Sequence, residues 1–183
     1  TQLTAIFAEN NNLSGPIPPG YSDLLKLDRI VLANNTLTGS IPAFNSPKLE
    51  FLDLMNNNLN GTIPNIIFSL EPLNIVYLNN NSLTGPIPIN YTTATNLKDL
   101  WLNHNMLTGT IPEPGYGDLP NITEILFNDN ALSGPVPDGL CALRSDFPDQ
   151  FIFLHADCIP AVGTDDPNNV CAASCCTACS VGK

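Results

Sequence analysis

Two histidines and a few carboxylates are the residues of this 183-residue chain whose types could support catalysis. His104 lies between Asp99 and Asp129 in the sequence, and a histidine oriented by a carboxylate is the core of a general-base hydrolase. No serine or cysteine is placed to act as the nucleophile beside it. The other histidine, His155, is distant in sequence, and a His/carboxylate metal site needs more converging ligands than these. We therefore predict a protein that is not an enzyme and that holds neither a metal nor another cofactor.

All six cysteines lie in the last 43 residues, and four of them share nine positions. They are Cys141, Cys158, Cys171, Cys175, Cys176 and Cys179. An even number of cysteines crowded into one terminal segment predicts a disulfide-stapled end, with about 15 pairings left open. Zinc is the alternative, but tetrahedral zinc ligands usually come as two separated pairs. Disulfides imply an oxidising, extracellular compartment.

The net charge of −11 narrows the classes of partner. Nucleic acid and anionic membrane surfaces would repel such a chain. No stretch approaches the roughly 20 apolar residues that span a bilayer. We therefore expect no nucleic-acid partner and no membrane insertion in this segment.

Six asparagines carry the Asn-x-Ser/Thr glycosylation signal, which supports the same extracellular location. They are Asn12, Asn34, Asn60, Asn80, Asn90 and Asn121. An asparagine-rich repeat produces such matches by chance. Asn90 and Asn121 lie outside the repeated asparagine positions and are the better candidates for a glycan.

One asparagine recurs at intervals of 24, 22, 24, 24 and 25 residues and organises most of the chain. Its copies are Asn11, Asn35, Asn57, Asn81, Asn105 and Asn130. Each is followed by Leu at +2, Gly at +4 and an Ile/Val-Pro pair at +6 and +7, and apolar residues recur at −8, −5 and −3. Six copies in register indicate a solenoid of stacked turns.

Elementary physical chemistry explains the pattern. The alternation at −5 and −3 is that of a strand with one buried face. One turn of the chain cannot bury its own leucines, so neighbouring turns must stack to close the core. We expect the repeated asparagines to form a buried ladder that bonds backbone groups left unpaired by the tight turn. Glycine permits backbone conformations that other residues avoid, and proline suits the exit from the strand region.

The segment 97–112 and its equivalents resemble the plant-type leucine-rich repeat, over about residues 3–140. The resemblance implies a right-handed solenoid of the α/β repeat class, with a concave parallel sheet, a second short strand near each Leu-Thr-Gly segment and 3-10 turns on the convex side. It also implies a receptor ectodomain, a receptor-like protein or an inhibitor of cell-wall-degrading enzymes. We predict six repeats in residues 1–140, followed by a degenerate seventh strand (151–154) and a cysteine-rich cap within residues 141–183. The tail resembles those of secreted repeat proteins of diatoms and related algae, and an N-terminal cysteine-pair cap is missing.

Two columns of strand residues should point out from the concave sheet rather than into the core. The −4 column reads Phe7, Val31, Asp53, Tyr77, Trp101 and Leu126, and the −6 column reads Ala5, Arg29, Phe51, Ile75, Asp99 and Glu124. Exposed aromatic residues commonly mark interaction sites, although strand propensity alone also selects them. We predict that a protein, peptide or glycan binds around Phe51, Ile75, Tyr77 and Trp101. Asp53, Asp99, Glu124 and Asp129 would favour a cationic ligand or grip a sugar.

Three further patterns leave alternatives open. The −1 column is a regular polar series, so His104 is expected to be one of its structural members: Asn10, Asn34, Asn56, Asn80, His104 and Asp129. The residues before the repeat glycines could stack as a flat array that binds ice or a polysaccharide: Ser14, Thr38, Asn60, Thr84, Thr108 and Ser133. Finally, the bare first turn would expose apolar residues through which the chain could self-associate end to end in a fibre or adhesive layer: Leu3, Ile6, Leu13 and Ile17.

Overall fold

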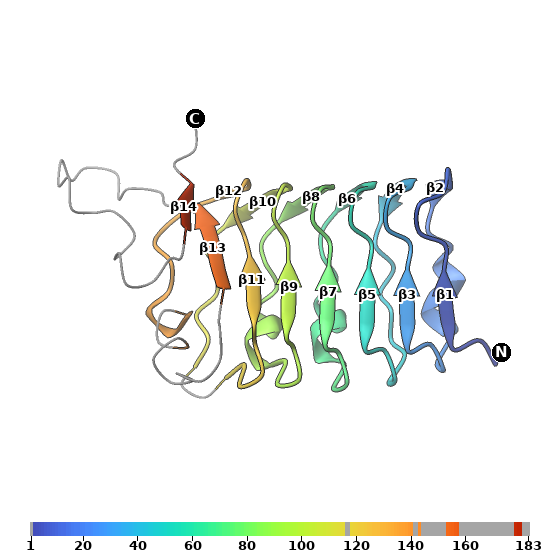
Figure 1. Ribbon diagram of the computed structural model, residues 1–183, viewed down its shortest axis with the longest axis horizontal. Helices are drawn as coiled ribbons and strands as arrows, with labels where there is room; N and C mark the ends of the chain where they lie inside the picture. The colour runs from blue at the N-terminus through green and yellow to red at the C-terminus, as the bar shows by residue number, and fades with distance from the viewer. Residues whose placement is uncertain (1, 116–117, 141–142, 144–152, 158–177, 181–183) are drawn as a thin grey trace.

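The computed structural model describes residues 2–115, 118–140, 143, 153–157 and 178–180. Its main element is an eight-stranded parallel sheet in the order β1-β3-β5-β7-β9-β11-β13-β14. The strands are β1 (Ala5–Phe7), β3 (Arg29–Val31), β5 (Phe51–Asp53), β7 (Ile75–Tyr77), β9 (Asp99–Trp101), β11 (Glu124–Leu126), β13 (Phe153–Asp157) and β14 (Ala178–Ser180). Successive turns stack side by side from the N-terminus to the C-terminal end (Figure 1). The outer side of this sheet is the predicted concave face.

A second, six-stranded parallel sheet forms the adjoining wall, in the order β12-β10-β8-β6-β4-β2. Its strands are β2 (Ser14–Pro16), β4 (Thr36–Ser40), β6 (Asn58–Gly61), β8 (Ser82–Gly85), β10 (Met106–Gly109) and β12 (Ala131–Leu132). The 3-10 helices of the described residues lie on the opposite side from the main sheet (Figure 1): η1 (Pro19–Asp23), η2 (Asn65–Ser69) and η3 (Ile89–Thr93). The predicted solenoid, its two sheets and its convex 3-10 turns are therefore confirmed. No helix of the described residues is long and apolar enough to cross a membrane.

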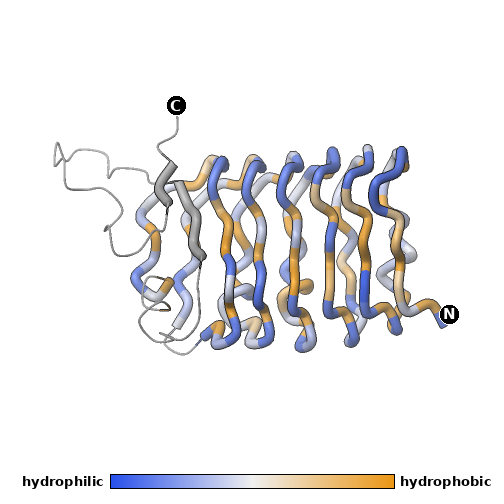
Figure 2. The backbone as a smooth tube through the Cα atoms, viewed as in Figure 1, coloured by the Kyte–Doolittle hydropathy of each residue, from blue (hydrophilic) through white to orange (hydrophobic). Residues whose placement is uncertain are grey.

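The core follows the repeat. In the turn that contains β5, Leu52, Leu54 and Leu59 have no exposed surface, and the equivalent residues of neighbouring turns pack above and below them. Hydrophobic and hydrophilic bands recur in each turn of the chain (Figure 2). The repeat glycines all adopt positive φ, between 75° and 83°, which is the left-handed conformation open to glycine. The pattern thus buries one apolar row per turn and bends the chain at the same place each time.

The repeat asparagines join each turn to the one before it. The side-chain amide of Asn57 donates to the carbonyl of Leu32 in the preceding turn (3.0 Å) and to those of Leu54 and Met55 in its own turn (3.2 Å each). Its Oδ1 accepts from the backbone N–H of Leu37, again in the preceding turn (3.0 Å). The same pattern recurs at Asn35, Asn81, Asn105 and Asn130. This ladder holds the strands in register and so positions the concave face.

Asn11 differs from the expectation of a buried ladder throughout. It is exposed, and its side chain donates only to the carbonyls of Ala8 and Glu9 in its own turn. The physical reason is that the described residues contain no preceding turn whose backbone groups it could bond. Asn81 and Asn130 are partly rather than fully buried, although both make the bonds between turns.

A seventh strand is present at the C-terminal end, two residues later than predicted, as β13. It pairs in parallel with β11, with Glu124 opposite Phe153, and an unpredicted strand, β14, pairs with β13. Cys179 lies in the backbone of β14, whereas the other five cysteines lie outside the described residues. The predicted disulfides, and the boundary at residue 140 between repeats and cap, stay predictions.

The second sheet has a different register from the one expected for a Ser/Thr array. Thr38 pairs with Pro16 on one side and with Asn58 on the other, so equivalent residues are offset by two positions between neighbouring strands. A parallel sheet whose strands are staggered in this way cannot align one hydroxyl column directly across the strands. The residues Ser14, Thr38 and Thr84 are thus staggered rather than directly opposite one another, and their role as a binding array stays a prediction.

Candidate ligand-binding face

The aromatic residues predicted for the concave face contact one another across three strands. Tyr77 and Trp101 stack with ring centroids 4.1 Å apart and an interplanar angle of 29°. Phe51 meets Tyr77 edge-on, at 5.9 Å and 83°. All three residues, and Ile75, are half-buried. Because Tyr77 and Trp101 occupy the same position on neighbouring strands, each ring covers one face of the other, and their polar atoms are left to find partners at the edge of the stack.

Two carboxylates supply those partners. The hydroxyl of Tyr77 donates to Oδ2 of Asp99 (3.0 Å), and Nε1 of Trp101 donates to Oε2 of Glu124 (2.8 Å). Thr123 donates its hydroxyl to Oδ1 of Asp99 (2.6 Å). Burial, followed by the neighbouring Asp99 charge, raises the pKa of Tyr77 well above its ordinary value, so its hydroxyl keeps its proton. The structure thus brings together the predicted residues Tyr77, Asp99, Trp101 and Glu124, which lie on three neighbouring turns.

Asp53 does not belong to the exposed set. It is only 6% exposed, and its Oδ1 accepts a hydrogen bond from the backbone N–H of Met55 (3.1 Å). Burial raises the pKa of Asp53, partly opposed by the bond from Met55, and the charge of Glu9 raises it further. It lies between Val31 and Tyr77 in the −4 column, and it is a covered carboxyl group rather than the open contact that we expected.

The −1 column owes its composition to the backbone. Its six residues all adopt positive φ, between 53° and 56°: Asn10, Asn34, Asn56, Asn80, His104 and Asp129. Asparagine, aspartate and histidine tolerate this left-handed conformation better than most residues, which is a signal that the sequence contained. His104 shares it and forms an ion pair with Asp129 (Nδ1 to Oδ2, 3.2 Å), both side chains being about half exposed (50% and 49%). In the described part of the chain, no group of three or more His, Cys, Asp or Glu residues is arranged to hold a metal ion.

A row of buried asparagines lies on the same face and was not predicted from the sequence. Asn79, Asn103 and Asn128 are 7%, 8% and 5% exposed, and the Oδ1 atom of each is buried without a hydrogen-bond partner. Each lies two residues beyond the −4 column, so strand alternation places it on the same face as Tyr77 and Trp101. Their polar character disguised them as ordinary exposed positions. Buried carbonyl oxygens that lack a donor are uncommon in folded proteins.

The glycosylation signals are distributed over several surfaces. Asn12, Asn60, Asn80 and Asn121 are exposed, and Asn34 and Asn90 are half-buried. The amide of Asn90 donates to Oγ of Ser69 (3.1 Å), and that of Asn121 donates to the carbonyl of Thr95 (2.9 Å). Asn34 donates to Oδ1 of Asn10 within the −1 column (3.0 Å). Occupancy of any of these sites stays a prediction.

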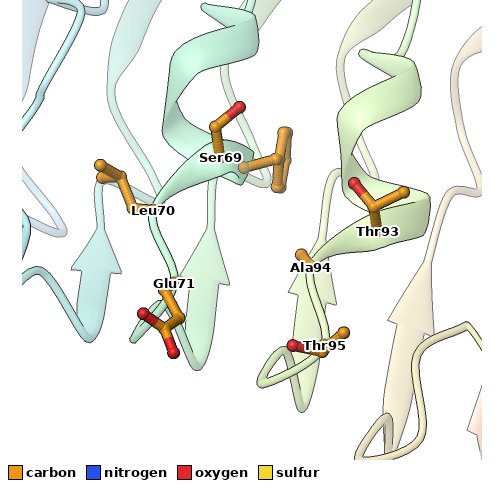
Figure 3. A pocket seen from close by; sticks show the side chains of 7 residues that line it. Ser69, Leu70, Glu71, Thr93, Ala94 and Thr95 are labelled. Atoms are coloured by element: carbon orange, nitrogen blue, oxygen red, sulfur yellow. The ribbon is translucent and has the colours of Figure 1, made fainter.

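A shallow hollow of about 260 Å³ lies on the opposite side of the molecule from the concave face. Two equivalent segments line it, one after η2 and one after η3: Phe68, Ser69, Leu70, Glu71, Thr93, Ala94 and Thr95. Figure 3 shows Glu71 and Thr95 on adjacent turns, side by side at its edge. None of the residues predicted to bind a ligand lines this hollow, and it brings no charged cluster together.

Comparisons with known proteins agree with this geometry. The family model described as Leucine Rich Repeat matches residues 48–70 and 96–115. A search of curated proteins finds no match. Among solved structures, the ectodomain of the Arabidopsis thaliana membrane receptor kinase GASSHO1/SCHENGEN3, in complex with CASPARIAN STRIP INTEGRITY FACTOR 2, is 31% identical with a TM-score of 0.75. The match covers 86% of this chain and 19% of that one, so this chain spans about a fifth of the ectodomain.

Two other solved structures are of more comparable length. Pollen Receptor Kinase 3 is 32% identical with a TM-score of 0.69, over 75% of this chain and 67% of that one. A plant ice-binding protein is 29% identical with a TM-score of 0.71, over 84% of this chain and 48% of that one. The identity and coverage shared with the pollen receptor kinase, together with the repeat and its fold, show that the chain belongs to the plant-type extracellular leucine-rich-repeat family.

Proposed function

We propose that this chain is an extracellular recognition module, part of a cell-surface receptor-like protein or a secreted matrix protein, and that it binds a protein, peptide or glycan on its concave face. The observation that carries the proposal is the aromatic cluster of Phe51, Tyr77 and Trp101, which is half-buried on a face that the hydrophobic core does not use. Partly exposed aromatic residues held in fixed positions are typical anchors of binding interfaces.

The comparisons support binding rather than catalysis. The related receptor-kinase ectodomain was solved with a bound partner, CASPARIAN STRIP INTEGRITY FACTOR 2. A structural role for His104 is supported by its left-handed backbone position, which it shares with the other residues of the −1 column, and by its pairing with Asp129. A protein or peptide is therefore the class of ligand that agrees best with the relatives.

The test compares wild type with the Tyr77→Ala/Trp101→Ala double variant on a displayed octapeptide library and on an array of cell-wall and matrix polysaccharides. Ligands selected by the wild type should lose at least about tenfold in affinity, because both anchors are removed. Tyr21→Ala is the matched control, since Tyr21 is a half-buried tyrosine in η1, away from the concave face. Selected ligands that bind the double variant within twofold of wild type would refute the proposed face.

A second candidate function is binding of ice or a polysaccharide by the second sheet. It is supported by the similarity to the plant ice-binding protein and by the composition of this sheet, because none of its strands, from β2 to β12, contains a charged residue. The staggered register weakens the idea of a single hydroxyl column but leaves a small, uncharged polar surface. Replacing Thr38 and Thr84 with lysine should abolish inhibition of ice recrystallisation if this function holds. Absence of such inhibition in the wild type excludes ice binding.

A further inference from the structure

The hydrogen-bond donors at the aromatic end of the concave face are already used. The hydroxyls of Tyr77 and Thr123 both donate to Asp99, and the indole N–H of Trp101 donates to Glu124. These bonds hold the two carboxylates in fixed positions beside the stacked rings. What these residues around the stacked rings still offer to a ligand is acceptor capacity, including Oε1 of Glu124.

The buried asparagine row adds to the same imbalance. Asn79, Asn103 and Asn128 lie beside the stack, and each keeps an Oδ1 atom that no donor satisfies. The amide of Asn128 is occupied by Asp129, to which it donates at 2.5 Å. A buried acceptor without a partner is unfavourable, because the hydrogen bonds that it made to water in the unfolded chain are not replaced. These oxygens therefore point to a ligand that supplies several donors.

Charge completes the description. Among the described residues, the only ion pair joins His104 and Asp129, so no lysine or arginine neutralises Asp99 or Glu124. The strands β7, β9 and β11 contain no lysine or arginine, and Lys98, which directly precedes β9, is exposed and forms no ion pair with a described residue. Half-buried carboxylates without a counter-charge favour a cation that arrives with its own donors.

We propose that the ligand of the concave face is a basic peptide segment, which places an arginine or lysine side chain between Asp99 and Glu124 and directs N–H groups toward the Asn79–Asn103–Asn128 row. This inference rests on the proposed function and specifies its ligand. A guanidinium or ammonium group provides donors and positive charge and has no acceptor, which is the complement of this surface.

A glycan fits the same surface less well. Sugar recognition uses an open aromatic face and a mixture of donors and acceptors. Here Tyr77 and Trp101 cover each other, and Leu126 occupies the equivalent position on the strand at the other side of Trp101. The hydroxyl and indole donors are committed to Asp99 and Glu124. A neutral sugar would meet acceptors and ring edges.

The experiment uses the full chain and two synthetic octapeptide libraries, one with arginine fixed at the fourth position and one with citrulline there. Citrulline has nearly the same shape as arginine but no charge. Peptides enriched on the wild type are measured by fluorescence anisotropy in both forms, and neutral oligosaccharides form a parallel arm. The test variant is Asp99→Asn/Glu124→Gln, whose side-chain carbonyls can still accept the bonds from Tyr77 and Trp101. The control, Asp23→Asn/Asp138→Asn, removes the same charge from exposed carboxylates off this face.

The expected result is that arginine peptides bind the wild type at least about tenfold more tightly than their citrulline forms, and that this ratio falls to within twofold in the Asp99→Asn/Glu124→Gln variant only. Equal binding of the two forms, or an arginine preference that survives in that variant, overturns the inference. Oligosaccharide binding that needs Trp101 but neither carboxylate charge also overturns it, while leaving the concave site in place. Peptides or oligosaccharides that bind the Tyr77→Ala/Trp101→Ala variant as tightly as the wild type overturn the proposed function as well.

Discussion

Replacing Asn57 with alanine removes four hydrogen bonds from the middle of the ladder. The lost acceptor leaves the backbone N–H of Leu37, a residue only 5% exposed, without its partner. The lost donor leaves the carbonyls of Leu32 and Leu54 with one partner each, because Asn35 still bonds the first and Asn81 the second. The damage is therefore concentrated on a single buried N–H group.

The magnitude follows from these contacts. An orphaned buried donor costs about 1–3 kcal/mol, and the weakened carbonyls add about 0.5 kcal/mol each, so we expect a loss of about 2–4 kcal/mol. For a chain of this size each kcal/mol lowers Tm by about 2–4 °C. Asn57→Ala should therefore melt at least about 4 °C below wild type.

Urea unfolding, followed by Trp101 fluorescence and by far-ultraviolet circular dichroism, measures the difference in the free energy of unfolding, and thermal unfolding measures the difference in Tm. Asn11→Ala is the matched control, because Asn11 is exposed and bonds only the carbonyls of its own turn, and it should lose less than about 1 kcal/mol. If the two variants differ by less than about 0.5 kcal/mol, the bonds between turns do not carry the stability that we assign to them.

Two further predictions concern packing and pH. A methyl group at Gly139 would overlap the carbonyl oxygen of Pro114, whereas one at Gly20 would meet open space. Gly139→Ala should therefore lower the free energy of unfolding by about 1–3 kcal/mol, and Gly20→Ala should change it by less than about 0.5 kcal/mol. Equal effects of the two substitutions in thermal unfolding would show that the contact with Pro114 does not constrain the turn. Asp53 has a raised pKa in the folded chain, so the folded state holds this proton more tightly than the unfolded chain does, and stability falls as pH rises from 3.8 through the folded-state pKa. Between pH 3.5 and 7, the free energy of unfolding of Asp53→Asn, measured by urea titration, should therefore increase relative to that of wild type. A difference between the two proteins that does not vary with pH would contradict the burial of this carboxyl group.

The fold was predictable because the same pattern of apolar residues recurs in six turns of the chain. The −5 and −3 residues, such as Leu52 and Leu54, are apolar in each turn, and these side chains can be buried only if neighbouring turns stack. The relation between Tyr77 and Trp101 was also available, since their spacing of 24 residues is one turn and places them on neighbouring strands.

Burial on the concave face was harder to predict, because it depends on the size of neighbours rather than on periodicity. Asp53 occupies the same column as Tyr77 and Trp101 yet is covered, and Asn79 is buried two residues beyond the aromatic stack. Periodicity assigns a residue to a face but does not say how far the rings and methylenes beside it extend. The partners of Asp99 and Glu124 were likewise hidden, because their hydrogen bonds depend on how each side chain is oriented between strands.

The ladder of asparagines has a direction, so the loss of a turn affects the N-terminal and the C-terminal side of the solenoid differently. Each asparagine completes the backbone of the turn before it, as Asn57 does for Leu37 and Asn35 for Leu13. Removing a whole turn from the N-terminal side exposes one asparagine, which water can solvate. Removing one from the C-terminal side leaves a backbone N–H group inside the last turn without an acceptor. Gain or loss of repeats at the N-terminal side is therefore tolerated more easily, whereas the C-terminal side requires a following segment that takes over the role of the next asparagine.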